Sequence, residues 1–251
     1  MQNLKFFDAS TKIGAPQNGL PAYAATTGEL LAEMDYHGVE RALVCHINAG
    51  GCGAEYANRA LAEFLAADTA HRLTGVWTIL PACTRELPQG KTLFQQMKAQ
   101  RIGALNIMPV EHGWILSRLS IGKQIEEAVE RRIPFIFYAP LWESIYTFMS
   151  LFPNARVICS SGGLWGTDRY FRPLLENYEN FFLELSTYWV PEGIADLARE
   201  YGAHRLLYGS GYPSYGHGSM MLALRQADLP AEDKVGIAGK NLERLLEEVQ
   251  G

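Results

Sequence analysis

Three polar side chains follow the first apolar segment of the chain, in the stretch FFDASTKIG at residues 6–14. Asp8, Ser10 and Lys12 are two residues apart, so on an extended strand they would point to the same side. An acid, a hydroxyl and an amine at one strand end can bind a polar ligand or move protons. If Lys12 is buried, Asp8 or Glu184 is its expected partner, because an unpaired buried ammonium is costly. Alternatively, this is a strand end whose polar groups are solvated, with Lys12 reaching water.

Other residues with useful chemistry end or follow later apolar segments. Together with Asp8, Ser10 and Lys12, the predicted ligand-binding residues are His46, Asn106, Tyr138, Ser160, Glu184, Ser186 and Tyr212. The catalytic candidates among them are Lys12, Tyr138 and His46. Hydroxyl and aromatic groups of this kind suit a small organic ligand with polar or anionic groups. Serines and tyrosines are also common in ordinary loops, so a surface without a ligand is the alternative.

Eight strand-like segments must position these residues, and they alternate with helix-like segments along the whole chain. Apolar runs such as IPFIFY are nearly continuous, which is typical of strands covered on both faces. The predicted strands are Leu4–Asp8, Arg41–His46, Leu73–Leu80, Gly103–Met108, Pro134–Tyr138, Arg156–Ser160, Phe181–Ser186 and Arg205–Gly209. The predicted helices lie at 26–38, 55–68, 122–132, 141–152, 167–178 and 190–202, with a less regular one at 84–100.

Eight such units in series predict a single (β/α)8 TIM barrel, an α/β fold, over residues 1–251 as one domain. Extra C-terminal helices are expected near Ser219–Ala227 and Lys240–Glu248. Ligand sites of such barrels lie at the carboxyl ends of the strands, where the candidate residues are. The same rule places His46, His112 and His217 on the functional face.

The composition excludes several classes of protein. The 251 residues are 48% hydrophobic and 20% charged, with a net charge of −5, which is typical of a globular protein with a sizeable core. An acidic chain without Lys/Arg runs does not favour nucleic-acid binding. No apolar run approaches the roughly 18 residues that span a bilayer, and no signal peptide is evident. We therefore expect no nucleic-acid or membrane partner and a cytoplasmic location. The four cysteines have no C-x-x-C spacing and are expected to be reduced.

Motifs along nearly the whole chain resemble the amidohydrolase-related family, the branch of the amidohydrolase superfamily that includes metal-dependent decarboxylases and lactonases. FFDASTKIG stands where that family has an Asp-x-His-x-His-like strand end. LLAEMDYHGVERALVCH resembles its first helix and second strand, and LFPNARVICSSGG resembles its sixth strand. GAHRLLYGSGYP resembles the eighth strand, and GKNLERLLEE resembles the closing helix. The resemblance implies the TIM barrel of a metal-dependent hydrolase.

The metal ligands that the resemblance implies fall on other residue types in this chain. The two first-strand histidines fall on Ser10 and Lys12, the fifth- and sixth-strand histidines on Tyr138 and Ser160, and the eighth-strand aspartate on Gly211. A transition metal needs three or more imidazole or carboxylate donors at about 2.0–2.2 Å. We therefore expect no metal, no cofactor and no metal-dependent hydrolysis.

Three functions stay open. The first is a barrel that binds a small polar or anionic organic ligand without turnover, and we rank it first. The second is a metal-independent hydrolase or lactonase, decarboxylase or Schiff-base lyase that uses Lys12, Tyr138 or His46. The third is an interaction protein, for example a homo-oligomer. A metal site rebuilt from His46, His112 and His217 is a further alternative.

Overall fold

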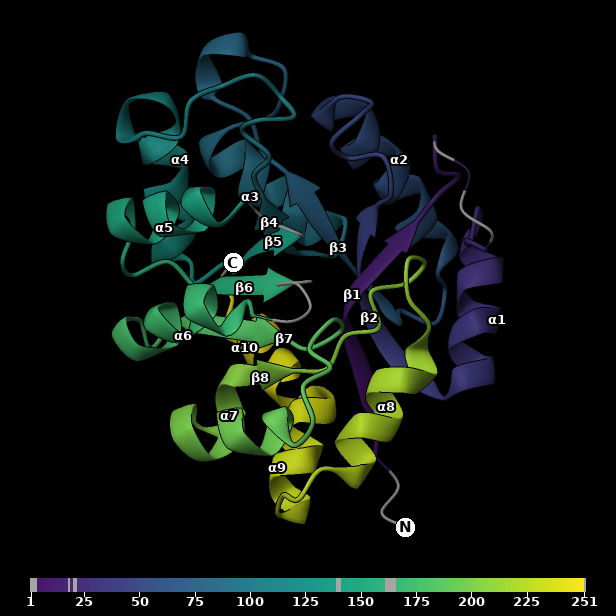
Figure 1. Cartoon of the computed structure of the whole chain (residues 1–251). Coiled ribbons are helices and arrows are strands. Elements are labelled where there is room, and N and C mark those ends of the chain that lie inside the picture. The colour runs from purple at the N-terminus through teal and green to yellow at the C-terminus, as the bar shows by residue number, and fades with distance from the viewer. Residues whose placement is uncertain (1–3, 18, 20–21, 139–140, 161–165, 251) are drawn as a thin grey trace.

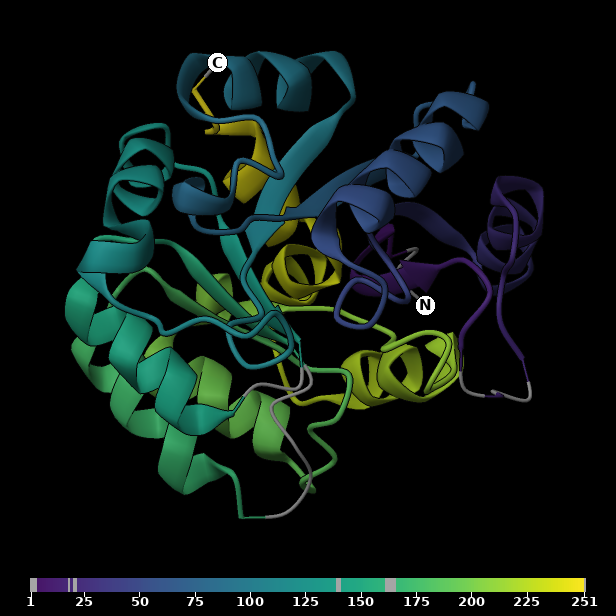
Figure 2. The ribbon, with the colours of Figure 1, turned by 90° about the horizontal axis from the view of Figure 1, so that it is seen from above.

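The computed structural model describes residues 4–17, 19, 22–138, 141–160 and 166–250. Eight parallel strands form one sheet in the order β1 to β8, and the helices lie outside them (Figures 1 and 2). The strands are β1 (Phe6–Ile13), β2 (Val39–His46), β3 (Leu73–Thr78), β4 (Ile102–Asn106), β5 (Phe135–Tyr138), β6 (Val157–Ser160), β7 (Phe181–Glu184) and β8 (Leu206–Leu207).

The sheet curls until its two edges meet, because backbone hydrogen bonds join β1 to the segment that follows β8. The Ala9 N–H donates to the Tyr208 carbonyl, and the Lys12 N–H donates to the Tyr212 carbonyl, both at 3.0 Å. A closed ring of eight parallel strands with intervening helices is a TIM barrel. The predicted fold is confirmed.

The main helices follow the strands in turn. They are α1 (Thr27–His37), α2 (Ala54–Ala67), α3 (Gly90–Ala99), α4 (Arg118–Glu130), α5 (Trp142–Leu151), α6 (Asp168–Asn177), α7 (Gly193–Tyr201), α8 (His217–Gln226), α9 (Ala231–Val235) and α10 (Asn241–Glu247). The short turns η1 (Ala82–Thr84), η2 (Ala203–Arg205) and η3 (Gly236–Lys240) complete the chain. The irregular helix expected at 84–100 begins only at Gly90. Arg85 ends η1 with φ = 57°, and Pro88 disfavours helix in the residue before it.

Local signals set the ends of α1. The Thr26 hydroxyl accepts from the Glu29 N–H, and the Glu29 carboxylate accepts from the Thr26 N–H, which is a capping box. Gly38 ends the helix with φ = 76°, a left-handed conformation that favours glycine. This helix packs against β2.

Two apolar layers hold the barrel together. The interior cluster includes Phe7, Leu43, Ile136 and Phe182, whose neighbours in sequence face the surrounding helices instead. The helix α10 contributes Leu242 and Leu245 to the interior cluster. This closes the amino-terminal end of the barrel, so the polar side chains gather at the opposite end.

β1 and β8 differ from their predicted lengths, and both differences matter for the site. β1 continues to Ile13 because Lys12 and Ile13 pair in register with Cys45 and His46 of β2. β8 contains just two residues, Leu206 and Leu207. Consequently FFDASTKIG is not a strand end but the whole of β1 followed by Gly14, and its polar residues stand inside the ladder.

Candidate functional site

The strict alternation of side chains along β2 and β4–β7 selects which polar residues face the barrel interior. Ile136, Ile158 and Phe182 belong to the interior cluster, so the residues two positions later point inward as well. These are Tyr138, Ser160 and Glu184, and the same reasoning adds Cys45 on β2 and Asn106 on β4. We call the inward-facing residues at the carboxyl ends of the strands the barrel mouth; its members are Ser10, Lys12, Cys45, Thr78, Asn106, Tyr138, Ser160 and Glu184.

A bulge in β1 separates Asp8 from Ser10 and Lys12. Asp8 pairs with Ala42 and Thr11 with Val44, so β1 uses one more residue than β2 over this interval. Such an extra residue breaks the alternation of side chains. Ser10 and Lys12 contact β6 and β5, whereas Asp8 contacts the segment after β8 and α8. The prediction that all three point to one side is therefore wrong for Asp8.

Hydroxyl groups surround Glu184 at the centre of the mouth. The Ser160 and Ser186 hydroxyls donate to Glu184 Oε2 at 2.8 and 2.9 Å, and the Ser186 N–H donates to Oε1. Ser160 Oγ also lies 2.7 Å from Ser10 Oγ. The carboxyl group crosses over Gly209, where a Cβ would lie 2.0 Å from Oε1. Glycine at this position is what lets Glu184 occupy the mouth.

The carboxyl group of Glu184 titrates near neutral pH. Its side chain is 1% exposed, and burial raises its pKa to about 7 against the opposing hydrogen bonds from Ser160 and Ser186. The negative charge of Asp8 contributes to this rise. A carboxyl group with such a pKa can accept or release a proton at physiological pH, which is the property of a general acid or base.

Asp8 forms a buried ion pair with a histidine of α8. Asp8 Oδ2 lies 3.3 Å from His217 Nδ1, and both side chains are 0% exposed. Asp8 Oδ1 accepts the N–H groups of Ser10 and Ser210 at 2.9 Å. Burial alone would raise the pKa of Asp8, but His217 and these hydrogen bonds lower it below 3.8. Asp8 thus fixes the bulge of β1 to the end of β8.

Lys12 lies in the mouth over an aromatic ring instead of beside Asp8. Its Nζ is 5.3 Å from the centroid of the Tyr138 ring, a cation–π distance. Burial raises the pKa of the Cys45 thiol to about 11, and the positive charge of Lys12 acts in the opposite direction. The Asn106 amide donates to Cys45 Sγ at 3.9 Å. Since Asp8 pairs with His217, the expected Lys12–Asp8 pair is wrong.

Several polar atoms of the mouth are buried without a hydrogen-bond partner among the described residues. They are Tyr138 Oη, Asn106 Oδ1 and Thr78 Oγ1. Thr78 was not predicted, because the third strand was expected to run to Leu80, whereas Thr78 is its last residue and pairs with Asn106. Tyr138 keeps its proton, because burial and the charges of Cys45, Glu184 and Asp8 raise its pKa well above 10.0. It is a donor there and not a base.

Two of the predicted site residues face away from the mouth. His46 follows Cys45, so it points outward, against Phe64 and Tyr56 of α2, and burial lowers its pKa. Tyr212 stacks on His217 with ring centroids 5.3 Å apart. The alternation of side chains along β2 sets the orientation of His46. The closure of the barrel between β1 and the segment after β8 sets the orientation of Tyr212. The geometry therefore gives His46 no contact with the other catalytic candidates.

The ligand positions implied by the family resemblance hold serine, lysine, tyrosine and glycine. Ser10 and Ser160 bond to each other, and Lys12 brings a positive charge. Gly211 has φ = +70°, and a Cβ there would lie 2.9 Å from the Tyr215 ring, so an aspartate would be strained. Within the described ranges, no three His, Cys, Asp or Glu residues gather closely enough to hold a metal ion.

The three histidines considered as a relocated site lie in separate surroundings. His46 packs on α2, and His217 pairs with Asp8. His112 Nε2 lies 2.9 Å from the Ala49 carbonyl oxygen. The three rings therefore do not converge on one point in the described part of the chain.

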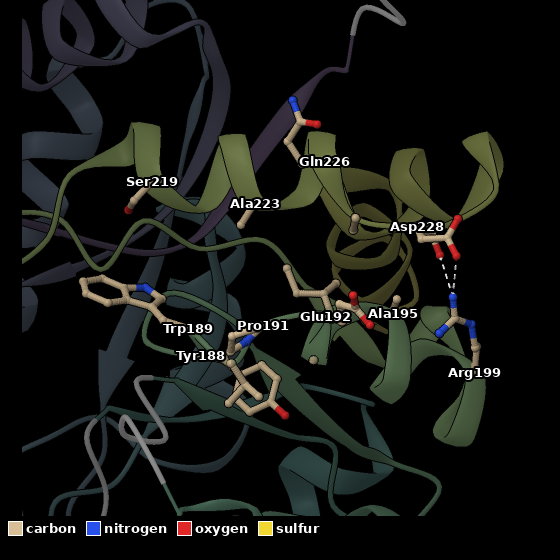
Figure 3. A pocket seen from close by; sticks show the side chains of 14 residues that line it. Tyr188, Trp189, Pro191, Glu192, Ala195, Arg199, Ser219, Ala223, Gln226 and Asp228 are labelled. Atoms are coloured by element: carbon tan, nitrogen blue, oxygen red, sulfur yellow. Dashed lines mark hydrogen bonds and ion pairs between the residues drawn. The ribbon is translucent and has the colours of Figure 1, made fainter.

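A groove of about 550 Å³ lies outside the mouth, between the segment 188–195 and α8. Figure 3 shows Trp189 and Ser219 at one end and the Arg199–Asp228 ion pair at the other. The Trp189 indole N–H donates to the Ser186 carbonyl at 3.0 Å. One wall of the groove is therefore tied to the segment that also holds Glu184.

The family model described as amidohydrolase matches residues 12–247. The chain belongs to the amidohydrolase family. This confirms the resemblance seen in the motifs. A search of curated protein sequences gives no significant match. None of the helices in the described part of the chain is long and apolar enough to cross a lipid bilayer.

Solved structures of several enzymes share the fold at low identity. A 2,6-dihydroxybenzoate decarboxylase from Rhizobium has a TM-score of 0.71 at 15% identity, covering 98% of this chain and 99% of its own. A probable 2-pyrone-4,6-dicarboxylic acid hydrolase from Acinetobacter baumannii, with citric acid bound, has 0.70 at 14%, covering 97% and 100%. A 5-carboxyvanillate decarboxylase from Novosphingobium aromaticivorans, with manganese and 3-methoxy-4-hydroxy-5-nitrobenzoic acid, has 0.71 at 13%, covering 97% of both.

Proposed function

We propose that this chain, as one domain over residues 1–251, binds a small organic anion at the barrel mouth without a transition metal. The observation that carries the proposal is Lys12, a cation that lies inside the mouth over Tyr138. An anion bound there would gain a charge-assisted hydrogen bond of about 1.5–3 kcal/mol. Two of the solved relatives hold carboxylic acids, which are ligands of this class.

The unpartnered atoms of the mouth support a polar ligand. Tyr138 Oη and Asn106 Oδ1 are buried and lack a partner among the described residues. A buried polar group without a hydrogen bond costs about 1–3 kcal/mol, so a ligand that bonds to them would relieve this cost. Tyr138 would donate to an anionic oxygen, and Asn106 Oδ1 would accept from a ligand hydroxyl.

The test of metal-free binding combines elemental analysis with calorimetry. Protein purified without chelator should hold less than about 0.1 equivalent of transition metal and should still bind citrate, benzoate or pyruvate in isothermal titration. Lys12→Met should weaken that binding about 10- to 100-fold, by the loss of a charged hydrogen bond. Lys123→Met, which removes a lysine whose side chain is 90% exposed, is the matched control. Near-stoichiometric metal, or equal binding by both variants, contradicts the proposal.

A metal-independent enzyme that uses the same barrel mouth is the second candidate, and the pKa of Glu184 near 7 favours it. The solved relatives are decarboxylases and a hydrolase, so turnover of a carboxylate or lactone fits the family. A Schiff base on Lys12 would be trapped by borohydride together with a carbonyl substrate, and Lys12→Met would abolish the trapping. Product formation that survives removal of metal would distinguish this candidate from a binding protein.

A further inference from the structure

Three side chains form a continuous hydrogen-bonded chain across the barrel mouth. Ser10 Oγ lies 2.7 Å from Ser160 Oγ, and the Ser160 hydroxyl donates to Glu184 Oε2 at 2.8 Å. The exposed fractions of the three residues are 3%, 0% and 1%. Proton transfer along such a chain is shielded from bulk water, because each link is a short bond between buried groups.

The direction of the chain follows from proton counting. A hydroxyl has one proton to donate and lone pairs to accept. Since Ser160 gives its proton to Glu184, it must accept from Ser10. Ser10 Oγ is then left with acceptor capacity, and no described residue donates a hydrogen bond to it. A proton that arrives at Ser10 can therefore reach Glu184 without any hydroxyl first rotating.

Groups that stabilise negative charge stand at the same end of the chain. Lys12 follows Ser10 by two residues on β1, beyond the bulge, and lies over the Tyr138 ring. The Tyr138 hydroxyl keeps its proton and has no partner among the described residues. Both Lys12 and Tyr138 are partly exposed, whereas the Tyr138 hydroxyl itself is buried. A proton acceptor beside two oxyanion-stabilising groups is the arrangement that proton abstraction next to a carbonyl requires.

We propose that Ser10–Ser160–Glu184 is a proton relay that accepts the α-proton of a small 2-oxo or 3-oxo acid bound at Lys12. The inference rests on the proposed anion site and adds its substrate class. The α-carbon loses its proton to Ser10 Oγ as the Ser10 proton passes to Ser160 Oγ and the Ser160 proton to Glu184 Oε2. The C–H electron pair forms the C=C bond of the enolate, whose oxygen charge Lys12 and Tyr138 stabilise. The reverse steps return a proton to carbon, so no oxidant is needed.

The closing experiment follows deuterium exchange by proton NMR in D2O, with pyruvate, 2-oxobutyrate and acetoacetate as probes and the full chain as catalyst. The α-protons of at least one probe should exchange faster than in buffer. The rate should rise with pH and level off above about 7, where Glu184 becomes ionised. Ser160→Ala and Glu184→Gln should each slow exchange at least about 100-fold, while isothermal titration still detects the bound probe.

Two further variants separate the relay from a loss of folding. Ser160→Thr keeps the hydroxyl and should restore exchange to within about tenfold of the wild type. Ser186→Ala removes a hydrogen bond to Glu184 that lies outside the relay. It should slow exchange at most about fivefold and move the pH profile upward, because a lost donor disfavours the carboxylate.

The possible failures are distinguishable. A probe that binds without exchanging, or exchange that survives both Ser160→Ala and Glu184→Gln, overturns the relay and leaves the anion site standing. Failure of all three probes, citrate and benzoate to bind overturns the anion site, and the relay with it.

Discussion

Replacing Glu184 by glutamine should change how the stability of the protein depends on pH. In the folded chain, burial raises the pKa of this carboxyl group from the ordinary 4.5 to about 7. A difference of this size corresponds to about 3 kcal/mol, at about 1.4 kcal/mol for each tenfold change. The folded state therefore holds a proton between pH 4.5 and 7 that the unfolded state releases.

The sign follows from linkage. A group whose pKa is raised on folding contributes stability below its unfolded pKa, and that stability is lost as pH rises through the folded value. Wild-type protein should thus lose about 3 kcal/mol of unfolding free energy from this group between pH 4.5 and 8. Glu184→Gln carries no such titration. Its free energy of unfolding minus that of the wild type should therefore rise by about 3 kcal/mol between pH 4.5 and 8.

Urea denaturation at pH 5, 6, 7 and 8, followed by tryptophan fluorescence, measures this difference. Glu232→Gln makes the same chemical change at an exposed position and should show no comparable trend. If wild type and Glu184→Gln differ by a constant amount at all four pH values, Glu184 does not titrate near 7 in the folded state, and the reasoning about its environment is refuted.

The remaining predictions concern the backbone and the ion pair around the mouth. Gly209→Ala should lower the free energy of unfolding by about 2–3 kcal/mol in urea denaturation, because its Cβ would lie 2.0 Å from Glu184. Gly211→Asp should cost about 1–3 kcal/mol at φ = +70°, and elemental analysis should find no gain in zinc or manganese. Asp8→Asn should cost about 3 kcal/mol at pH 7, since it removes a buried carboxylate that accepts two backbone N–H bonds and lies 3.3 Å from His217 Nδ1. Because folding lowers the pKa of Asp8, the stability that the wild-type carboxylate contributes should be lost as pH falls below 3.8. Acid denaturation curves of wild type and Asp8→Asn that coincide would argue against the pair.

Gly218 of α8 supplies a control for the two glycine variants. A Cβ at that position would meet no atom within 4 Å. Gly218→Ala should therefore leave stability unchanged or raise it slightly, since alanine favours helix more than glycine does. A loss as large as that of Gly209→Ala would mean that the steric argument is wrong.

Much of the architecture was accessible from the order of apolar segments. Alternating strand-like and helix-like stretches predict the barrel, and the barrel rule then collects polar residues from distant segments at one end. Tyr138, Ser160 and Glu184 were found in this way, because each lies at the end of a regular strand whose side chains alternate strictly. Their shared location needs no knowledge of contacts, since parallel strands carry their carboxyl ends to the same edge.

Other parts of the site depend on contacts that no local pattern encodes. The extra residue in β1 is defined by its pairing with β2, and it alone turns Asp8 away from Ser10 and Lys12. His217 reaches Asp8 across 209 positions in sequence because α8 packs beside β1 (Figure 1).

The sequence by itself determined which residue types reach the mouth, because backbone periodicity fixes side-chain direction within a regular strand. The tertiary structure decided their partners. A hydrogen bond or ion pair requires two side chains to meet within about 3 Å, and register, bulges and helix packing set that distance, not spacing along one segment.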